Sequence, residues 1–216
     1  MSIISILNPK GGCGKTTIST NLARALHDQG FHVLLVDSDP QGSARDWHAT
    51  RDDNPLELIA LDRPNNVKTL SSMANNYDFI VIDGAAKLED MLAACIKVSD
   101  LVLIPVQPSP YDIWAASDLV AFIKARQEVT DGKPYACFIL SRVVEGTKLG
   151  QDIRVALDDY ALPVISAAIG QRQVYPQTAA EGLSVYETDN DKAKAEITLM
   201  AGDVQRLLSP DQQAVA

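Results

Sequence analysis

The sequence has no long apolar run and no recognisable targeting segment. None of its hydrophobic stretches approaches the roughly 20 residues that span a bilayer, and the first residues, MSIISILNPKGG, lack a basic region followed by a small-residue cleavage site. Its three cysteines are odd in number, widely spaced and outside any CxxC or Cys/His cluster, which excludes a disulfide framework and a structural zinc site. We therefore expect a cytoplasmic protein in which Cys95 and Cys137 serve packing.

Positive charge is scarce as well. The 216 residues include 19 Lys and Arg against 28 Asp and Glu, so the formal net charge is −9. A protein that always binds nucleic acid needs a dominant basic field, so any DNA contact must come from a local patch that forms under particular conditions. The candidates are Lys148, Arg154, Lys192 and Lys194, and each is equally well explained as a solvated surface residue.

The hydrophobic pattern predicts a single α/β domain. Short β-branched or leucine-rich runs alternate with longer amphipathic runs, and the short runs show so little polar alternation that they suit strands buried on both faces of a parallel sheet. The expected strands are 2–7, 31–36, 56–61, 79–82, 101–106, 135–140 and 163–169, and the expected helices are 15–29, 42–52, 66–76, 88–98, 112–130, 148–160 and 190–208. We expect a three-layer α/β fold with a mostly parallel seven-stranded sheet flanked by helices over residues 1–208, and a flexible tail at 209–216.

A glycine-rich loop follows the first expected strand. Residues 9–17 read PKGGCGKTT, and the closely spaced glycines let backbone N–H groups converge on a polyphosphate at the start of a helix. Lys15 is placed to reach the β- and γ-phosphates, and Thr16 can offer its hydroxyl to Mg²⁺. The residues expected to contact the nucleotide here are Gly11, Gly12, Cys13, Gly14, Lys15, Thr16 and Thr17. This motif predicts a P-loop NTPase.

A second lysine, Lys10, precedes the glycines, and Pro9 occupies the position of the usual first glycine. The stretch KGGCGKTT resembles the deviant phosphate loop, KGGxGKT[ST], of the ParA/MinD family of ATPases. The resemblance implies that Lys10 crosses a dimer interface and acts on the nucleotide of the partner subunit. Its place at the loop entrance agrees with this role, because Lys15 already serves the phosphates of its own subunit. A solvated surface lysine is the alternative.

Aspartates follow the second and fourth expected strands. Residues 37–42 read DSDPQG and residues 78–84 read DFIVIDG, so Asp37, Asp39 and Asp83 lie at carboxyl ends of strands, where open α/β sheets bind ligands. DSDPQ matches the family's DxDPQ, and the resemblance assigns Asp39 to activation of the attacking water and Asp37 to the Mg²⁺ neighbourhood. Asp83 ends a Walker B-like strand and is expected to hold a Mg²⁺-bound water. A helix N-cap is the alternative role for Asp39.

The sequence identifies the adenine site less clearly than the phosphate and Mg²⁺ sites. The resemblance places the base near two loops at the same edge of the sheet, at Ser141, Arg142, Gln171 and Arg172. An arginine can stack on a purine, but the two arginines fit the surface or a DNA contact equally well. The base-reading motif NKxD of GTPases is absent.

The resemblance covers nearly the whole chain. The phosphate loop, DSDPQG, FIVID, PVQPSPYD and GQRQVY come in family order and at family spacing, as in the small ParA-type plasmid partition proteins of the ParF group. It implies a slow ATP hydrolase that uses Mg²⁺ and segregates DNA on the bacterial nucleoid. ATP would drive a homodimer that binds nonspecific DNA, and a centromere-binding ParB-type adaptor would stimulate hydrolysis. The loop begins ten residues from the start, so we expect the partner to supply sequence-specific DNA recognition.

Three other classes share parts of this pattern. A MinD-type membrane-cycling ATPase would need a basic amphipathic C-terminal helix, whereas the run 196–208 contains two acidic residues and a single arginine. A nitrogenase-reductase-type electron carrier would need paired cysteines at a dimer axis. A small-molecule ligase of the dethiobiotin synthetase type shares the loop and the sheet but does not need Lys10. DNA partition is therefore our prediction, with the membrane-cycling ATPase and the ligase as alternatives.

Overall fold

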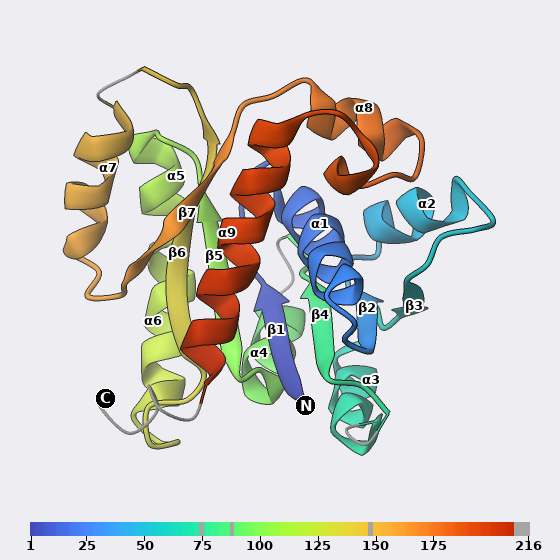
Figure 1. Ribbon diagram of the computed structural model, residues 1–216. Helices are drawn as coiled ribbons and strands as arrows, with labels where there is room; N and C mark the ends of the chain where they lie inside the picture. The colour runs from blue at the N-terminus through green and yellow to red at the C-terminus, as the bar shows by residue number, and fades with distance from the viewer. Residues whose placement is uncertain (74–75, 87–88, 147–148, 210–216) are drawn as a thin grey trace.

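A seven-stranded sheet forms the centre of the computed structural model, which describes residues 1–73, 76–86, 89–146 and 149–209 (Figure 1). The strands are β1 (Ser2–Ile6), β2 (Val33–Asp37), β3 (Glu57–Ala60), β4 (Phe79–Asp83), β5 (Leu101–Val106), β6 (Tyr135–Val143) and β7 (Val164–Gly170). They lie in the order β3-β2-β4-β1-β5-β6-β7, and all of these pairings are parallel. The predicted α/β fold with a parallel sheet is thus confirmed.

Helices cover both faces of the sheet. One face packs against α3 (Pro64–Val67), the 3₁₀ helix η1 (Lys68–Met73), α4 (Glu89–Val98), α5 (Pro110–Ala115), α6 (Ser117–Gln127) and α7 (Leu149–Asp158). The other face packs against α1 (Lys15–Asp28), α2 (Ser43–Ala49), α8 (Val174–Ala180), the 3₁₀ helix η2 (Val185–Glu187) and α9 (Asp191–Leu208), of which α1 and α9 cross in front of the strands in Figure 1. The molecule therefore has three layers.

The strands contribute to two separate apolar cores because successive residues of a strand point to opposite faces. Ile3 and Ile80 pack with α4 and α6 on one face, whereas Ile4 and Val81 pack with α1 and α9 on the other. Both faces of the central strands are thus buried. This explains why these strands show no polar alternation in the sequence.

Several predicted helices differ from those in the structure. The expected helix 112–130 is two helices, α5 and α6, with a break at Ala116. Helix α5 begins earlier than expected, at Pro110, because the first position of a helix tolerates proline. The expected helix 66–76 is the short α3 followed by a 3₁₀ helix. Helix α8 was not among the expected helices; its Pro176 lies in the first turn, where a proline removes no helical hydrogen bond.

No helix among the described residues combines the length and apolar character needed to cross a membrane. Residues 210–216 of the expected tail lie outside the described part of the chain.

Candidate functional site

The strand order brings two of the predicted aspartates together. Asp37 and Asp83 are register partners at the ends of β2 and β4, and Ile6, the last residue of β1, is the other partner of Asp83. Both carboxylates are buried. Because the glycine-rich loop follows β1, the loop and the two acidic segments meet at the carboxyl edge of the sheet, as the motif positions predict.

The glycine-rich loop turns sharply into α1 at Gly14. The backbone of Gly14 has a φ of 97°, which residues other than glycine rarely adopt, and a Cβ added there would lie 2.8 Å from Ser141 Oγ. Ser141 in turn donates a hydrogen bond of 2.6 Å to the Cys13 carbonyl. Ser141 therefore braces the loop from β6, a structural role that the sequence did not reveal.

Lys15 and Cys13 both bond the inside of the same loop. The Lys15 side chain is buried, and its Nζ donates to the Lys10 carbonyl oxygen at 3.1 Å. The Cys13 thiol donates to the same oxygen at 3.3 Å, and burial raises its pKa although Lys15 is close. The thiol is thus a protonated packing group, as expected for the free position of the motif.

The Lys10 side chain points the other way, toward α5. Its Nζ lies 2.5 Å from Asp112 Oδ2, and the Lys10 side chain is 35% exposed whereas that of Asp112 is 3% exposed. Two further contacts join the residues in and just before the phosphate loop to the end of β5 and to the residue that follows it. Asn8 Nδ2 donates to the Pro105 carbonyl at 2.7 Å, and Gln107 Nε2 donates to the Gly12 carbonyl at 3.0 Å. Lys10 is therefore neither a freely solvated lysine nor directed at its own phosphate loop.

Asp83 receives hydrogen bonds from two hydroxyls of α1. Thr16 Oγ1 donates to Asp83 Oδ2 at 2.7 Å, and Ser19 Oγ donates to Oδ1 at 3.1 Å. Burial raises the pKa of Asp83 to about 7, with a further contribution from the charge of Asp37, although the two hydroxyls and Lys15 act in the opposite direction. The carboxylate is thus placed where a cation would stabilise its charged form.

The oxygen donors at this edge fit Mg²⁺. Thr16 and Asp83 lie in contact, and Asp37 is the register partner of Asp83. Within the described ranges there is no group of three or more His, Cys, Asp or Glu side chains that could hold a metal on its own. This suits Mg²⁺, which proteins often bind through one or two side chains together with substrate phosphates and water. When bound, Mg²⁺ would offset phosphate charge.

The DSDPQG segment is organised by its own aspartates. Asp37 accepts hydrogen bonds from the backbone N–H groups of Asp39 (3.0 Å) and Arg45 (2.9 Å). Asp39 accepts from the Gln41 N–H at 2.9 Å and, across the site, from the Ala86 N–H at 3.3 Å. Helix α2 has Gly42 as its N-cap residue and no side-chain cap, so Asp39 does not cap it.

The residue after Asp83 must be small. A Cβ on Gly84 would lie 2.5 Å from the Ile6 carbonyl oxygen and 2.4 Å from Leu7 Cδ2. Gly84 N–H also donates to that carbonyl oxygen, which continues the strand pairing one step beyond β4. The loop that follows therefore leaves the sheet close to the phosphate loop, and the Asp39 contact with Ala86 joins it to the DSDPQG segment.

The residues expected near adenine lie in different environments. Arg142 is exposed and has a φ of 54°, and Gln171 is also exposed. Arg172 is held by two carboxylates, with Nη2 2.6 Å from Glu196 and 2.5 Å from Glu145. Stacking of Arg172 on a base would compete with both ion pairs, whereas Arg142 has no such constraint among the described residues.

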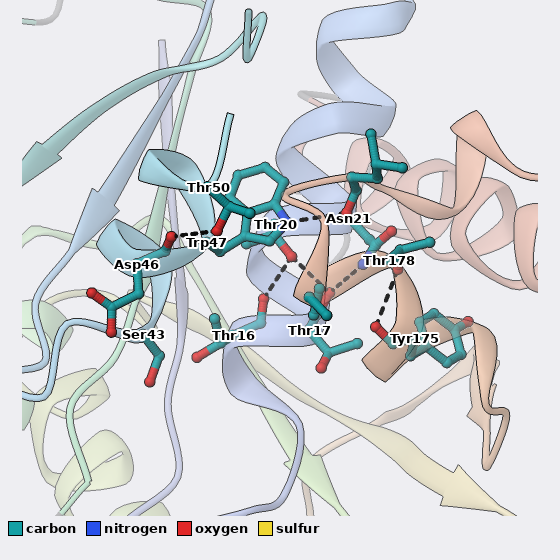
Figure 2. Close-up of a pocket in the computed structure, with 13 residues that line it drawn as sticks. Thr16, Thr17, Thr20, Asn21, Ser43, Asp46, Trp47, Thr50, Tyr175 and Thr178 are labelled. Atoms are coloured by element: carbon teal, nitrogen blue, oxygen red, sulfur yellow. Dashed lines mark hydrogen bonds between the residues drawn. The ribbon is translucent and has the colours of Figure 1, made fainter. Parts of the chain in front are cut away.

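A cavity of about 380 Å³ adjoins the first turn of α1, between α1, α2 and α8 (Figure 2). Thr16 and Thr17 line its end nearest the phosphate loop, and Trp47 forms part of its wall, with Nε1 donating to the Leu183 carbonyl at 3.0 Å. The hydroxyls of Thr20, Thr50 and Thr178 donate to nearby backbone carbonyls, whereas those of Thr17 and Ser43 bond none of the described residues. The Thr17 hydroxyl is therefore available to a ligand.

The expected DNA-binding residues differ in the contacts that they make. Lys148 lies outside the described residues. Arg154 donates to two backbone carbonyls of β7, and Lys192 Nζ lies 3.1 Å from Glu145. Lys194 is half-buried near the start of α9 and makes no contact of this kind with the described residues. Any DNA contact by Arg154 or Lys192 would thus compete with an existing contact.

Comparison with known proteins identifies the family. A family model described as the CobQ/CobB/MinD/ParA nucleotide binding domain matches residues 4–185. The chain belongs to this family. As a ParA/MinD-type protein it is a P-loop ATPase, and its cofactors are ATP and Mg²⁺.

Individual relatives extend over most of the chain. Maintenance of carboxysome distribution protein A of Halothiobacillus neapolitanus is 32% identical over 188 residues, which cover 85% of this chain and 86% of that protein. Sporulation initiation inhibitor protein Soj of Bacillus subtilis is 31% identical over 167 residues, 58% of this chain and 66% of Soj. The MinD cell division protein of Aquifex aeolicus has the same fold, with a TM-score of 0.77 at 22% identity over 97% of this chain and 99% of that one.

Proposed function

We propose that this ATPase dimerises on binding Mg·ATP and uses the dimer to position a cargo on DNA. The observation that carries the proposal is the division of labour between the two lysines of the phosphate loop. Lys15 is buried and bonds the inside of its own loop, whereas the Lys10 side chain turns away from the loop toward Asp112 of α5 and is partly exposed. A partly exposed lysine that does not bond its own loop suits the nucleotide of a second subunit.

Within one subunit, we assign the predicted roles to the residues at the carboxyl edge. Lys15 would contact the β- and γ-phosphates, and the glycines with Cys13 and Thr17 would bind the rest of the triphosphate. Thr16, Asp37 and Asp83 would hold Mg²⁺ or its bound water. Asp39, whose carboxylate faces the loop after β4, would orient the attacking water.

The dimer accounts for DNA binding by an acidic protein. A net charge of −9 disfavours binding by the monomer, but two copies of a small patch on one face bind with increased avidity. Of the cations considered for a DNA contact, the exposed Arg142 and the half-buried Lys194 make no ion pair with the described residues. Association with the bacterial nucleoid would follow.

Two kinds of cargo are supported by different observations. The motif order resembles the ParF group, which favours a plasmid or another DNA cargo carried through a centromere-binding ParB-type adaptor. The 32% identity to carboxysome distribution proteins of two organisms instead favours a protein assembly as cargo, with a corresponding adaptor. Both are positioning functions of one domain that spans residues 1–208.

A membrane-cycling role has less support. Helix α9 is amphipathic, but its apolar face, formed by Ile197, Met200, Ala201 and Val204, is buried against the core of the domain. Exposing that face to lipid would remove it from β7 and α1. The small-molecule ligase alternative gives no reason for an outward Lys10.

Sizing by light scattering tests the proposal. We expect a monomer with ADP, a dimer with ATP, and binding of nonspecific DNA that requires ATP and weakens steeply with salt. Lys10→Ala should keep monomer nucleotide binding but lose the dimer, whereas Lys15→Ala should lose nucleotide binding. Equal loss of nucleotide affinity in the two variants, or equal DNA affinity with ADP and ATP, would contradict the proposal.

A further inference from the structure

Asp112 is a buried carboxylate that the nucleotide chemistry described above does not use. It lies in α5 with 3% of its side chain exposed. Its Oδ2 accepts from Lys10 Nζ at 2.5 Å, and its Oδ1 is buried and accepts no hydrogen bond within the described part of the chain. Lys10 is thus the cation that compensates this buried charge.

The main chain of Lys10 is held by several contacts, whereas its side chain is held by one within the described ranges. Its N–H donates to Asn8 Oδ1 at 2.8 Å, and its carbonyl oxygen accepts from Lys15 Nζ and the Cys13 thiol. Among the described residues, the ammonium group contacts only Asp112. To reach a second subunit it must leave this carboxylate, which would then stay buried without a counter-charge, an unfavourable state.

We propose that Asp112 is a positioning residue that holds Lys10 within its own subunit and thereby opposes dimerisation until a partner's triphosphate competes for the ammonium group. This inference rests on the proposed role of Lys10 across the dimer. A triphosphate carries more charge than a diphosphate, so it competes better with one carboxylate. The pair would therefore suppress dimers with ADP and set the protein concentration at which ATP produces them.

The opposite role has a distinct signature. If Asp112 instead aims Lys10 at the partner, removal of its charge weakens the dimer. If Asp112 holds Lys10 within its own subunit, as we propose, removal of the Asp112 charge strengthens the dimer. The sign of the effect on dimerisation, measured apart from nucleotide affinity, therefore distinguishes the two.

The test compares Asp112→Asn with Asp118→Asn, which removes the same charge from an exposed position in α6. Dimer dissociation constants are measured by light scattering with a slowly hydrolysed ATP analogue and with ADP. For Asp112→Asn we expect a dissociation constant lower by on the order of tenfold, because formation of the dimer breaks two such ion pairs, one in each subunit, with unchanged affinity of the monomer for a fluorescent ATP analogue. Asp118→Asn should match the wild type, and Asp112→Glu should restore the wild-type threshold.

Each other outcome has one meaning. An unchanged or weaker dimer of Asp112→Asn overturns the inference while leaving the proposed function intact. A wild-type protein that stays monomeric with ATP instead contradicts the proposed function. Cooperative thermal unfolding checks that the variant folds, and Asp112→Ser repeats the measurement if the asparagine variant does not.

Discussion

Replacement of Gly14 by alanine tests whether the phosphate loop is held in a backbone conformation that only glycine adopts easily. Two independent features oppose a side chain at position 14: the φ of 97°, and the distance of only 2.8 Å from an added Cβ to Ser141 Oγ. Gly11 offers a matched control in the same loop, because nothing lies within 4 Å of its added Cβ and its φ is not positive.

The size of the effect follows from these two obstacles. A side chain held in this sparsely populated backbone region costs about 1–3 kcal/mol. The new methyl group also forces the Ser141 hydroxyl away from the Cys13 carbonyl, which removes a buried hydrogen bond worth about 1 kcal/mol. Gly14→Ala should therefore lower the free energy of unfolding by about 2–4 kcal/mol, and Gly11→Ala by less than about 1 kcal/mol.

Urea unfolding of four variants, each compared with the wild type, measures the backbone contribution and the hydrogen-bond contribution. Besides the two alanine variants, these are Ser141→Ala and its combination with Gly14→Ala. Because both changes disturb the same hydrogen bond, the double variant should lose about 1 kcal/mol less than the sum of the single losses. Equal losses for Gly14→Ala and Gly11→Ala would refute the backbone argument, and strict additivity would refute the part assigned to Ser141.

Three further outcomes are expected. Lys15→Ala should abolish tight ATP binding measured by calorimetry, whereas Asp39→Ala should keep binding and lose phosphate release; hydrolysis by Asp39→Ala at the wild-type rate would contradict its role. Burial alone would raise the pKa of Asp203, but hydrogen bonds led by that from the Ala167 N–H hold it below its usual value. Asp203→Asn should thus lower the free energy of unfolding at pH 7 by about 1–3 kcal/mol, as measured by urea unfolding. The difference from wild type should vanish as the pH falls through the lowered pKa of Asp203, because these hydrogen bonds favour only the charged carboxylate. Burial also raises the pKa of all three cysteine thiols, so a thiol reagent at pH 8 should modify them only after unfolding.

Much of the site could be predicted because it lies where parallel strands end. Asp37 and Asp83 are 46 positions apart in the sequence, yet the strand pattern alone indicates that both end a strand, and parallel strands end at one edge. The phosphate loop is equally local, since its glycines and its lysine act through backbone positions within nine residues. Such features need no knowledge of side-chain packing.

The contacts of side chains from distant segments could not be predicted. Asp112 lies 102 positions from Lys10, and its PSPYD context suggests only a turn before a helix. Ser141 was expected near the base, but its hydroxyl braces the loop at Cys13. The ion pair between Arg172 and Glu196 depends on how α9 packs beside the end of β7. In each case the decisive fact is which loops lie together at the edge, and sequence spacing does not specify it.

The chain from the end of β5 into α5 contacts the residues in and just before the phosphate loop. Asn8 Nδ2 donates to the Pro105 carbonyl at the end of β5, Gln107 Nε2 donates to the Gly12 carbonyl, and Lys10 pairs with Asp112 of α5. We therefore expect a movement of the loop on nucleotide binding to be transmitted to this segment. The same helix α5 exposes most of Tyr111 and Trp114, whose rings stack edge to face. A change at the phosphates thus has a short path to an outer surface, as the proposal that ATP drives dimerisation requires.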